Sequence, residues 1–247
     1  MRVLILGGTG EARALAGRLH PDFDVVSSLA GRVPDPALPV GPVRIGGFGG
    51  ADGLRKWLDD NAIAAVVDAT HPFAATISAN VANACGGLAV PHLVLSRPPW
   101  EVPAAVRVAG DTAAADMVAE KGYSRVFLTT GRSGTAAFAD SDAWFLIRVV
   151  TQPDPQSLPE RHELLLSRGP YELDGERKLM AANRIDVLVT KNSGGPLTRA
   201  KLDAAAELGV EIVMIERPPL PSGVATVGTV DEAVDWIRRL SRDSAVG

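Results

Sequence analysis

The chain contains a single cysteine, Cys85, among 247 residues. One cysteine excludes an internal disulfide and a cluster of thiolate metal ligands, and it is typical of a protein in the reducing cytoplasm. The four histidines are scattered, and no carboxylate cluster accompanies them at the spacing of metal ligands. We therefore predict a cytoplasmic protein without a bound metal.

Long hydrophobic runs are also missing. The apolar stretches have the length of a strand and are interrupted by glycine, proline or charge, which predicts no membrane span. Glycines at positions 7, 8 and 10 interrupt the first apolar run too early for a signal peptide. The net charge of −4 argues against a general nucleic-acid-binding surface, although it is compatible with a local basic pocket.

Three common catalytic motifs are absent. Tyr123 and Tyr171 both lack a lysine four residues later, so the Tyr-x-x-x-Lys pair of short-chain dehydrogenases is missing. The segment 131–134 is one residue too short for a Gly-x-Ser-x-Gly turn, and no P-loop sequence occurs. These absences disfavour carbonyl reduction of the short-chain type, serine hydrolysis and phosphoryl transfer by a P-loop enzyme.

Strand-like and helix-like segments alternate along the chain, which predicts right-handed βαβ units and parallel sheets. In the first half, strand patterns cover 2–6, 23–28, 43–46, 64–68 and 91–96, and helical patterns cover 11–20, 50–61 and 72–86. In the second half, strands at 125–130, 143–149, 185–190 and 210–215 alternate with helices at 112–121, 171–182, 198–208 and 229–240. Segment 151–170, rich in proline and charge, is expected to be an irregular loop.

A break at Arg97-Pro98-Pro99-Trp100 separates the two halves. We predict an α/β fold of two Rossmann-like lobes with mainly parallel sheets flanked by helices. Residues 1–98 are expected to form an N-terminal dinucleotide-binding domain. Residues 99–247 are expected to form a C-terminal Rossmann-like α/β domain that completes a cofactor and substrate cleft.

The first strand runs directly into the turn Gly7-Gly8-Thr9-Gly10 and then into a helix. Glycines let the backbone approach a phosphate, and the amides at a helix N-terminus point at the anion, so the pattern favours a nucleotide contacted by Gly8, Thr9 and Gly10. The strict glycine fingerprint is incomplete, because Arg13 stands where a third small residue is usual. The alternative is a tight turn in a domain that binds nothing there.

The end of the second strand carries no acidic residue to bind the adenine ribose of NAD. The sequence there reads Ser27-Ser28-Leu-Ala-Gly-Arg32, and a guanidinium is well shaped to pair with a phosphate. The missing acid, together with Ser28 and Arg32, favours NADP(H) over NAD. The alternative interpretation of Arg32 is an ordinary solvated loop residue.

Polar segments follow three further strands, at the sheet edge where open α/β sheets bind ligands. His71 lies in Asp68-Ala-Thr-His-Pro-Phe-Ala74, where it could donate a proton or could simply cap a helix. Two other segments resemble anion cradles, and their candidate residues are Thr130, Gly131, Lys191, Asn192 and Ser193.

Several arginines adjoin a proline, a glycine or a strand end rather than a solvated helix face. Gathered around an inter-domain cleft, they would suit a ligand with several carboxylates, whereas singly each is more often a surface ion-pair partner. These residues are Arg97, Arg132, Arg148, Arg168 and Arg217.

An ordered set of motifs from residue 1 to about Pro218 resembles the precorrin-6A reductase family of cobalamin biosynthesis. The motifs are Gly7-Gly-Thr-Gly-Glu-Ala-Arg13, Ser28-Leu-Ala-Gly-Arg32, Asp68-Ala-Thr-His-Pro-Phe-Ala74, Ser96-Arg-Pro-Pro-Trp100, Thr129-Thr-Gly131 and Thr190-Lys-Asn-Ser-Gly194. The resemblance implies a two-domain reductase that converts the tetrapyrrole precorrin-6A to precorrin-6B with hydride from NADPH. A substrate with many carboxylate arms would explain a local positive cleft on an acidic protein.

The resemblance also implies roles for the candidate residues. Cofactor contacts are expected from Gly8, Thr9, Gly10, Ser28, Arg32, Thr130, Gly131, Lys191, Asn192 and Ser193, and substrate carboxylates are expected to bind Arg97, Arg132, Arg148 and Arg168. His71 is the first candidate for the proton donor, ahead of water. Two alternatives stay open, namely the cobalt-containing substrate of the anaerobic branch and a redox sensor that binds NADP(H) without turnover.

Overall fold

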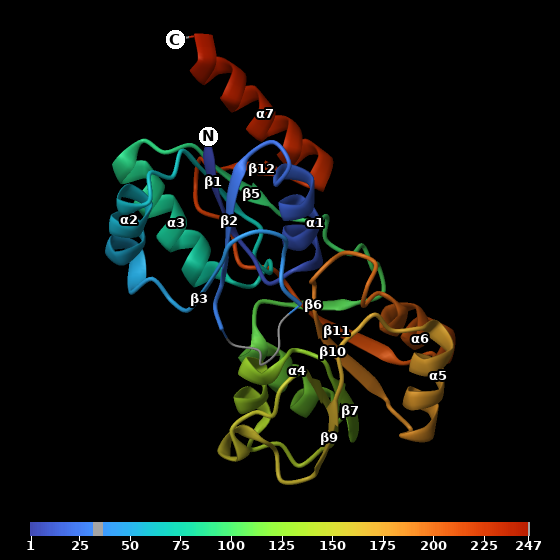
Figure 1. Cartoon of the computed structure of the whole chain (residues 1–247). Coiled ribbons are helices and arrows are strands. Elements are labelled where there is room, and N and C mark those ends of the chain that lie inside the picture. Colours follow the sequence, from blue (N-terminus) through green and yellow to red (C-terminus); the bar gives the residue numbers. More distant parts are fainter. Residues whose placement is uncertain (32–36, 247) are drawn as a thin grey trace. The chain divides into compact units, whose positions relative to one another are not determined.

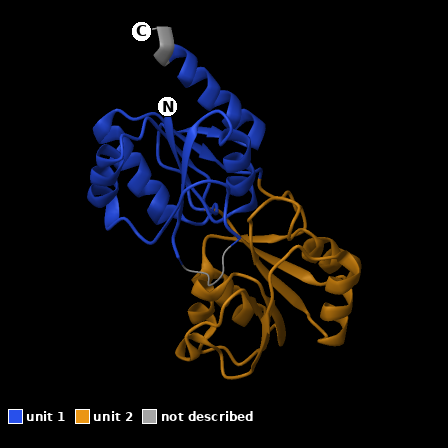
Figure 2. Ribbon diagram, in the orientation of Figure 1, with its two compact units in different colours: residues 1–98, 218–247 blue, residues 99–217 orange. Residues whose placement is uncertain are grey.

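The computed structural model describes residues 1–31 and 37–246. The chain divides into two compact units, Met1–Pro98 with Pro218–Gly247 and Pro99–Arg217 (Figure 2). The sequence-based boundary assigned residues 218–247 to the second domain, whereas the structure groups them with the first. The reason is that strand β12 pairs with β5 and helix α7 packs against α1.

The first unit is a six-stranded sheet with the strand order β3-β2-β1-β4-β5-β12 (Figure 1). Its strands are β1 (Arg2–Leu6), β2 (Asp24–Leu29), β3 (Val43–Ile45), β4 (Ala65–Asp68), β5 (His92–Leu95) and β12 (Ala225–Val227), and its helices are α1 (Gly10–Leu19), α2 (Gly50–Asp60), α3 (Ala75–Leu88) and α7 (Val230–Val246). Every strand pairing in it is parallel. This is the strand order of doubly wound dinucleotide-binding sheets. In such sheets the direction in which successive strands are added reverses once, and here it reverses between β1 and β4.

Alternation along β1 determines which helices cover each face of this sheet. Val3 and Ile5 pack in one cluster with residues of α1 and α7, and Leu4 and Leu6 pack in another with residues of α2 and α3. Figure 1 shows these two helix pairs on opposite sides of the sheet. Because all four side chains are buried, β1 is the centre of the unit, and its C-terminal end is held firmly in place.

The second unit repeats the arrangement with the order β9-β8-β7-β10-β11-β6, again with parallel pairings. Its elements are β6 (Val106–Val108), α4 (Asp111–Lys121), β7 (Arg125–Leu128), the 3-10 helix η1 (Arg132–Phe138), β8 (Trp144–Val149), the 3-10 helix η2 (Pro155–Ser157), β9 (His162–Leu166), α5 (Leu173–Ala182), β10 (Val187–Lys191), α6 (Ala200–Leu208) and β11 (Glu211–Ile215). Helices α5 and α6 cover one face and α4 the other (Figure 1). In this sheet the reversal of strand order lies between β7 and β10.

The predicted α/β class with two parallel, helix-flanked sheets is confirmed, but several elements differ from their prediction. Segment 151–170, expected to be irregular, contains strand β9. This strand lies at a sheet edge and pairs with β8 alone, so its side chains are only partly buried and carry no clear alternation. Helix α3 begins at Ala75 rather than at residue 72, because the chain first makes a turn in which the Ala74 amide bonds to the His71 carbonyl oxygen.

The core of the second unit contains three charged side chains, from β8, α5 and α6. Arg148 is 7% exposed and donates two hydrogen bonds to the Glu176 carboxylate, at 2.6 and 3.0 Å. Lys201 is 6% exposed, with its Nζ 5.3 Å from the centre of the Trp100 ring. Burial and the neighbouring Arg148 charge lower the pKa of Lys201 to about 7, while Glu176 opposes the shift.

We expect Lys201→Met to stabilise the protein by ~1–4 kcal/mol at neutral and lower pH, the range observed when apolar side chains replace buried ionic ones. The pKa of lysine in an unfolded chain is about 10.4. Between about pH 7 and about pH 10 the unfolded state therefore holds a proton that the folded state has lost, and the stability of the natural chain rises with pH. The gain from the substitution should shrink over the same range.

Urea unfolding at several pH values between about 6 and 10 measures this difference. Lys178→Met is the matched control, because Lys178 is an exposed lysine on the neighbouring helix α5. Parallel pH dependences for Lys201→Met and the natural chain would contradict the lowered pKa of Lys201.

Candidate functional site

The glycine turn of the first unit brings three elements into close contact. The Gly7 amide donates to the Ser28 carbonyl oxygen at 2.9 Å. A Cβ on Gly7 would lie 3.3 Å from the Ala12 side chain and 3.4 Å from the Leu29 side chain, so a larger residue would push α1 away from β2. Gly8 has φ +109°, which side chains rarely allow. Both glycines are therefore required by the local backbone.

The hydroxyl of Thr9 is engaged within the protein. It accepts from the Ala12 amide at 3.1 Å as the N-cap of α1, and it donates to the Ala69 carbonyl oxygen at 2.8 Å. This leaves the other amides of the first helical turn without intrahelical partners, which is the usual basis of anion binding at a helix N-terminus. Any contact of Thr9 and Gly10 with a ligand is therefore expected through their backbone.

One carboxylate stands in the first turn of α1, where it would repel an anion. Glu11 is paired with Arg97, with Oε2 and Nη1 2.9 Å apart and both side chains mostly buried. The pair neutralises the carboxylate at the entrance to the helix. It also means that Arg97, expected to bind substrate, already has a protein partner.

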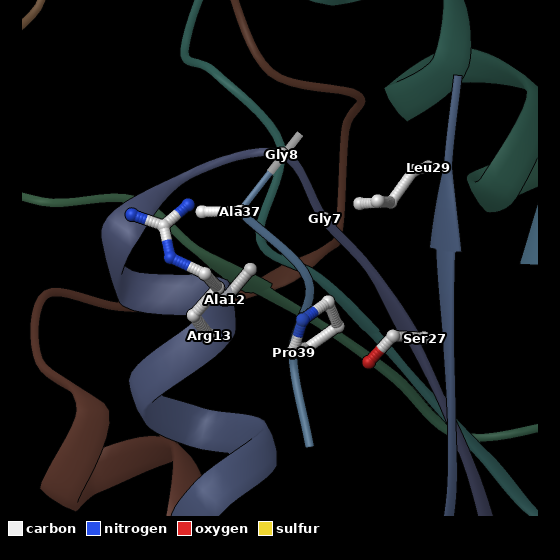
Figure 3. A pocket seen from close by; sticks show the side chains of 8 residues that line it. All are labelled: Gly7, Gly8, Ala12, Arg13, Ser27, Leu29, Ala37 and Pro39. Carbon is white, nitrogen blue, oxygen red and sulfur yellow. The ribbon is translucent and has the colours of Figure 1, made fainter. Parts of the chain in front are cut away.

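A pocket lies beside the glycine turn (Figure 3). Its lining residues come from the turn, from α1, from the end of β2 and from the chain after residue 36: Gly7, Gly8, Ala12, Arg13, Ser27, Leu29, Ala37 and Pro39. Arg13 is the one charged residue in this set, and Ser27 is the one residue with a hydroxyl. The described part of the lining is therefore apolar, with one cationic side chain and no carboxylate.

The serine predicted to bind the cofactor lies next to this pocket. Ser28 is buried, and its hydroxyl accepts from Arg44 Nη1 at 3.5 Å. Arg44 also donates to the carbonyl oxygens of Gly46 and Gly47 and stacks on the ring of Phe48, so it is fixed within the unit. The predicted phosphate ligand Arg32 lies outside the described residues.

The loop after β4 places His71 at the same sheet edge. The buried Asp68 carboxylate accepts from the Thr70 amide, the Thr70 hydroxyl and the Ser78 hydroxyl, and so fixes the loop to helix α3. His71 is exposed, and its Nδ1 accepts from the Phe73 amide at 3.3 Å. An Nδ1 that accepts a hydrogen bond leaves the proton of the neutral ring on Nε2.

In the second unit, polar atoms lie at the ends of β7 and β10, the two strands between which the strand order reverses. Lys191 Nζ lies 3.5 Å from an Asp111 carboxylate oxygen at the start of α4. The other Asp111 oxygen and the Thr130 hydroxyl are buried without a hydrogen-bond partner among the described residues. Gly131 follows with φ +80°. The cluster has the donors and the cation of the predicted anion cradle.

Asn192 has a different surrounding from the one that the motif predicted. The side chain is 1% exposed, and its amide accepts from the Trp100 backbone amide at 2.8 Å and donates to the Trp100 carbonyl oxygen. The Trp100 indole donates in turn to the Gly195 carbonyl oxygen. The Asn192 side chain therefore holds Trp100 against the 191–195 loop. Its backbone is engaged as well, because the amide donates to the Ile215 carbonyl oxygen at 2.9 Å and the carbonyl oxygen accepts from Arg217 Nε at 2.7 Å.

The remaining predicted arginines differ in their surroundings. Arg132 and Arg168 are exposed. Arg148 is buried and its charge is compensated by Glu176 inside the second unit, so it is poorly placed to bind a substrate carboxylate. The sequence alone does not reveal this buried partner on α5.

Comparison with known proteins identifies the family. The family model described as Precorrin-6x reductase CbiJ/CobK matches residues 2–238. The chain belongs to this precorrin-6x reductase family. A precorrin-6A reductase of Mycobacterium tuberculosis (strain CDC 1551 / Oshkosh) is 66% identical over 97% of this chain and 98% of its own length.

Two further matches extend the comparison within the precorrin-6x reductase family. A solved structure described as CobK precorrin-6A reductase has a TM-score of 0.90 at 36% identity, with 97% of each chain covered. A cobalt-precorrin-6A reductase of Priestia megaterium is 29% identical over 94% of this chain and 96% of its own length. The family resemblance and the fold predicted from the motifs are therefore confirmed.

Within residues 1–31 and 37–246, no three His, Cys, Asp or Glu side chains are grouped so as to hold a metal ion. Burial raises the pKa of the Cys85 thiol to about 12, so it is not a candidate nucleophile. The described helices include none that is long and apolar enough to cross a membrane.

Three residues of the candidate sites were not predicted as such. In the sequence, Arg13 stands out only as a departure from the glycine fingerprint, and Ser27 only as the neighbour of Ser28. Asp111 belongs to none of the motifs. A basic residue at the third fingerprint position and a carboxylate just after Gly110 at a helix start are the signals that could have identified Arg13 and Asp111.

We expect Gly134→Ala to destabilise the protein by about 1–3 kcal/mol, as overpacking does in a well-packed site. A Cβ on the buried Gly134 would overlap the Thr130 side chain and the Asp111 carboxylate, so one of them must move. Thermal or urea unfolding measures the loss. Gly175→Ala on α5 is the control, because its Cβ would meet nothing within 4 Å. Equal stabilities of the two variants would show that the cluster tolerates displacement.

Proposed function

We propose that this chain catalyses the reduction of precorrin-6A to precorrin-6B with hydride from NADPH. The observation that carries the proposal is the match to the Mycobacterium tuberculosis precorrin-6A reductase, at 66% identity over nearly the whole of both chains. The lower identity, 29%, to a relative described as a cobalt-precorrin-6A reductase favours the metal-free macrocycle as substrate.

A nicotinamide nucleotide fits the first unit. Its strand order is that of dinucleotide-binding sheets. The glycine turn follows β1, beside the point between β1 and β4 where the strand order reverses. Gly8 and Gly10 permit close approach of a pyrophosphate to the amides of the turn. The carboxylate of Glu11, in the first turn of α1, is neutralised by Arg97, which lessens its repulsion of an anion.

The end of β2 favours NADPH over NADH. NAD-binding sheets usually place an Asp or Glu there to accept from the ribose 2′-hydroxyl. Here the residues are Ser27, Ser28 and Leu29, and none of the described residues that line the adjoining pocket is acidic. A cationic pocket without a carboxylate suits a ribose that carries a 2′-phosphate.

The bound nicotinamide supplies hydride to one carbon of the macrocycle, and a proton must then reach the adjoining carbon. His71 is the proposed donor, because its exposed ring would carry a proton on Nε2 while Nδ1 accepts from the Phe73 amide. The Asp68 hydrogen bonds hold the loop that bears it. Positioning by such fixed elements is the main contribution that a protein makes to hydride transfer.

The acetate and propionate arms of the substrate need cationic partners. Arg132 and Arg168 are exposed and are proposed for this role, and Lys191 with Thr130 and Gly131 forms a further cradle for an anion. Arg97 can take part only while it also neutralises Glu11, and Arg148 is left out because Glu176 occupies its guanidinium.

The direct test is anaerobic incubation of the purified chain with precorrin-6A and NADPH while the absorbance of the reduced nicotinamide is followed. We expect consumption of one NADPH per macrocycle and a product heavier by two hydrogens. If NADPH is consumed with cobalt-precorrin-6A and not with precorrin-6A, the chain belongs to the anaerobic branch. Binding of NADPH without consumption in either reaction would identify a redox sensor instead.

We expect His71→Ala to lower the single-turnover rate by about 10²–10⁴-fold, the usual contribution of general acid catalysis. His71→Asn is the matched variant, because its side-chain oxygen can still accept from the Phe73 amide but cannot deliver a proton at neutral pH. Rapid-mixing absorbance measurements and the solvent isotope effect provide the readout.

Two outcomes would contradict the role of His71 as donor. If both variants keep the natural rate, the histidine has no role in the chemistry. If only His71→Ala is slow, the residue acts by capping the loop, and water delivers the proton.

A further inference from the structure

The pocket beside the glycine turn contains an arginine whose side chain has no partner among residues 1–31 and 37–246. The Arg13 side chain is half-buried in the first part of α1 and forms no hydrogen bond or ion pair with another described residue. Other arginines of the first unit have partners: Arg18 is paired with Asp231, and Arg44 with backbone carbonyl oxygens. Arg13 therefore keeps its donors available to a ligand.

Figure 3 shows where these donors lie. The Arg13 side chain extends from α1 toward Gly8 and Ala37, on the same side of α1 as the turn that would hold a pyrophosphate. The pocket walls are glycine, alanine, leucine and proline, which offer no competing charge. A guanidinium between apolar walls is only weakly screened by water, so it would attract an anionic group strongly.

A second polar group faces the same pocket. Ser27 is 2% exposed, and its hydroxyl is buried without a hydrogen-bond partner among the described residues. In Figure 3 the hydroxyl points toward Pro39 across the pocket. An unsatisfied buried hydroxyl is costly, and a ligand atom that reached the Ser27 hydroxyl would complete its hydrogen bonding.

We infer that Arg13 binds the 2′-phosphate of NADPH and that Ser27 contacts the same adenosine ribose. The inference rests on the proposed NADPH-dependent reduction and deepens it, because it assigns cofactor specificity to a helix residue. Doubly wound sheets place the adenosine ribose between the glycine turn and the end of the second strand, which are the elements that line this pocket. The arginine replaces the third small residue of the fingerprint and supplies the charge that the ribose phosphate requires.

The test compares ligands that differ only in the 2′-phosphate. Isothermal titration of the full chain with 2′,5′-ADP and with 5′-ADP isolates this group from the nicotinamide, and titration with NADPH and NADH repeats the comparison on whole cofactors. We expect Arg13→Ala to weaken binding of 2′,5′-ADP and NADPH by about 10- to 100-fold, as loss of a charge-assisted contact does. Binding of 5′-ADP and NADH should change by less than about twofold.

Three variants accompany Arg13→Ala. Arg18→Ala removes the same charge from the same helix, away from the pocket, and should leave the preference for 2′-phosphorylated ligands unchanged. Arg13→Lys keeps the charge without the planar fork and should recover part of the affinity. Ser27→Ala should weaken binding of all four ligands severalfold without lowering the melting temperature, because it removes a hydroxyl that has no hydrogen-bond partner among the described residues.

The outcomes separate this inference from the proposed function. If the natural chain binds neither NADPH nor NADH, the proposed cofactor is wrong. If it prefers the phosphorylated ligands and Arg13→Ala keeps that preference, the inference about Arg13 is overturned, and Arg32→Ala then tests the residue predicted from the sequence. Equal loss of 2′,5′-ADP and 5′-ADP binding in Arg13→Ala would also overturn it, because the arginine would then act without regard to the 2′-phosphate.

Discussion

The close approach of α1 to the ends of β1 and β2 is the constraint on which the first unit depends. Gly7 has no side chain, and its neighbours Ala12 and Leu29 leave room for none. The Gly7 amide joins the turn to β2, and the Thr9 hydroxyl joins it to the end of β4. Because three strand ends are fixed to one turn, the pocket is bounded by elements that cannot move independently, and a ligand would meet a preformed geometry.

The second unit has a similar parallel sheet, with its N-terminal strand β6 at the edge where the first unit has its C-terminal strand β12. It builds its ligand-binding sheet edge differently. After β7 the chain forms the 3-10 helix η1 rather than an α-helix. A 3-10 helix is short and has poorer hydrogen-bond geometry, so it offers a weaker aligned dipole to an anion. The cation of Lys191 and the hydroxyl of Thr130 are the groups proposed to meet an anion here, with Asp111 balancing the lysine. One sheet edge therefore offers mainly backbone amides, and the other offers mainly side chains.

The sequence predicted the parts of this structure that follow from strong local patterns. Strand β1 and helix α1 lie almost where the apolar run and the glycine turn placed them, because burial on both faces leaves a clear signal. The short edge strands β6, β9 and β12 were missed, since three to five half-buried residues carry no distinctive periodicity. The return of residues 218–247 to the first unit depends on a pairing between β12 and β5, which are distant in sequence.

Prediction of the site failed where the outcome depended on a partner elsewhere in the chain. Asn192 lies in a glycine-rich motif typical of anion binding, yet its amide is occupied by Trp100 from a segment about ninety residues earlier. Arg148 follows the same logic, because Glu176 on another element takes up its charge. A sequence shows how many cations a protein has, whereas the fold determines which of them still have donors to offer a ligand.

This distinction explains how an acidic chain can recognise anions. Of 25 lysines and arginines against 29 acidic residues, most of the cations that have described contacts stand next to a carboxylate. Each such pair contributes little to stability when it lies at the surface, and its opposite charges nearly cancel in their effect on a distant ion. The proposed recognition of the 2′-phosphate relies on Arg13, which has no carboxylate beside it among the described residues and lies against apolar pocket walls. Such a local cation can attract an anion even though the chain carries a net charge of −4, so the proposal needs no surplus of positive charge.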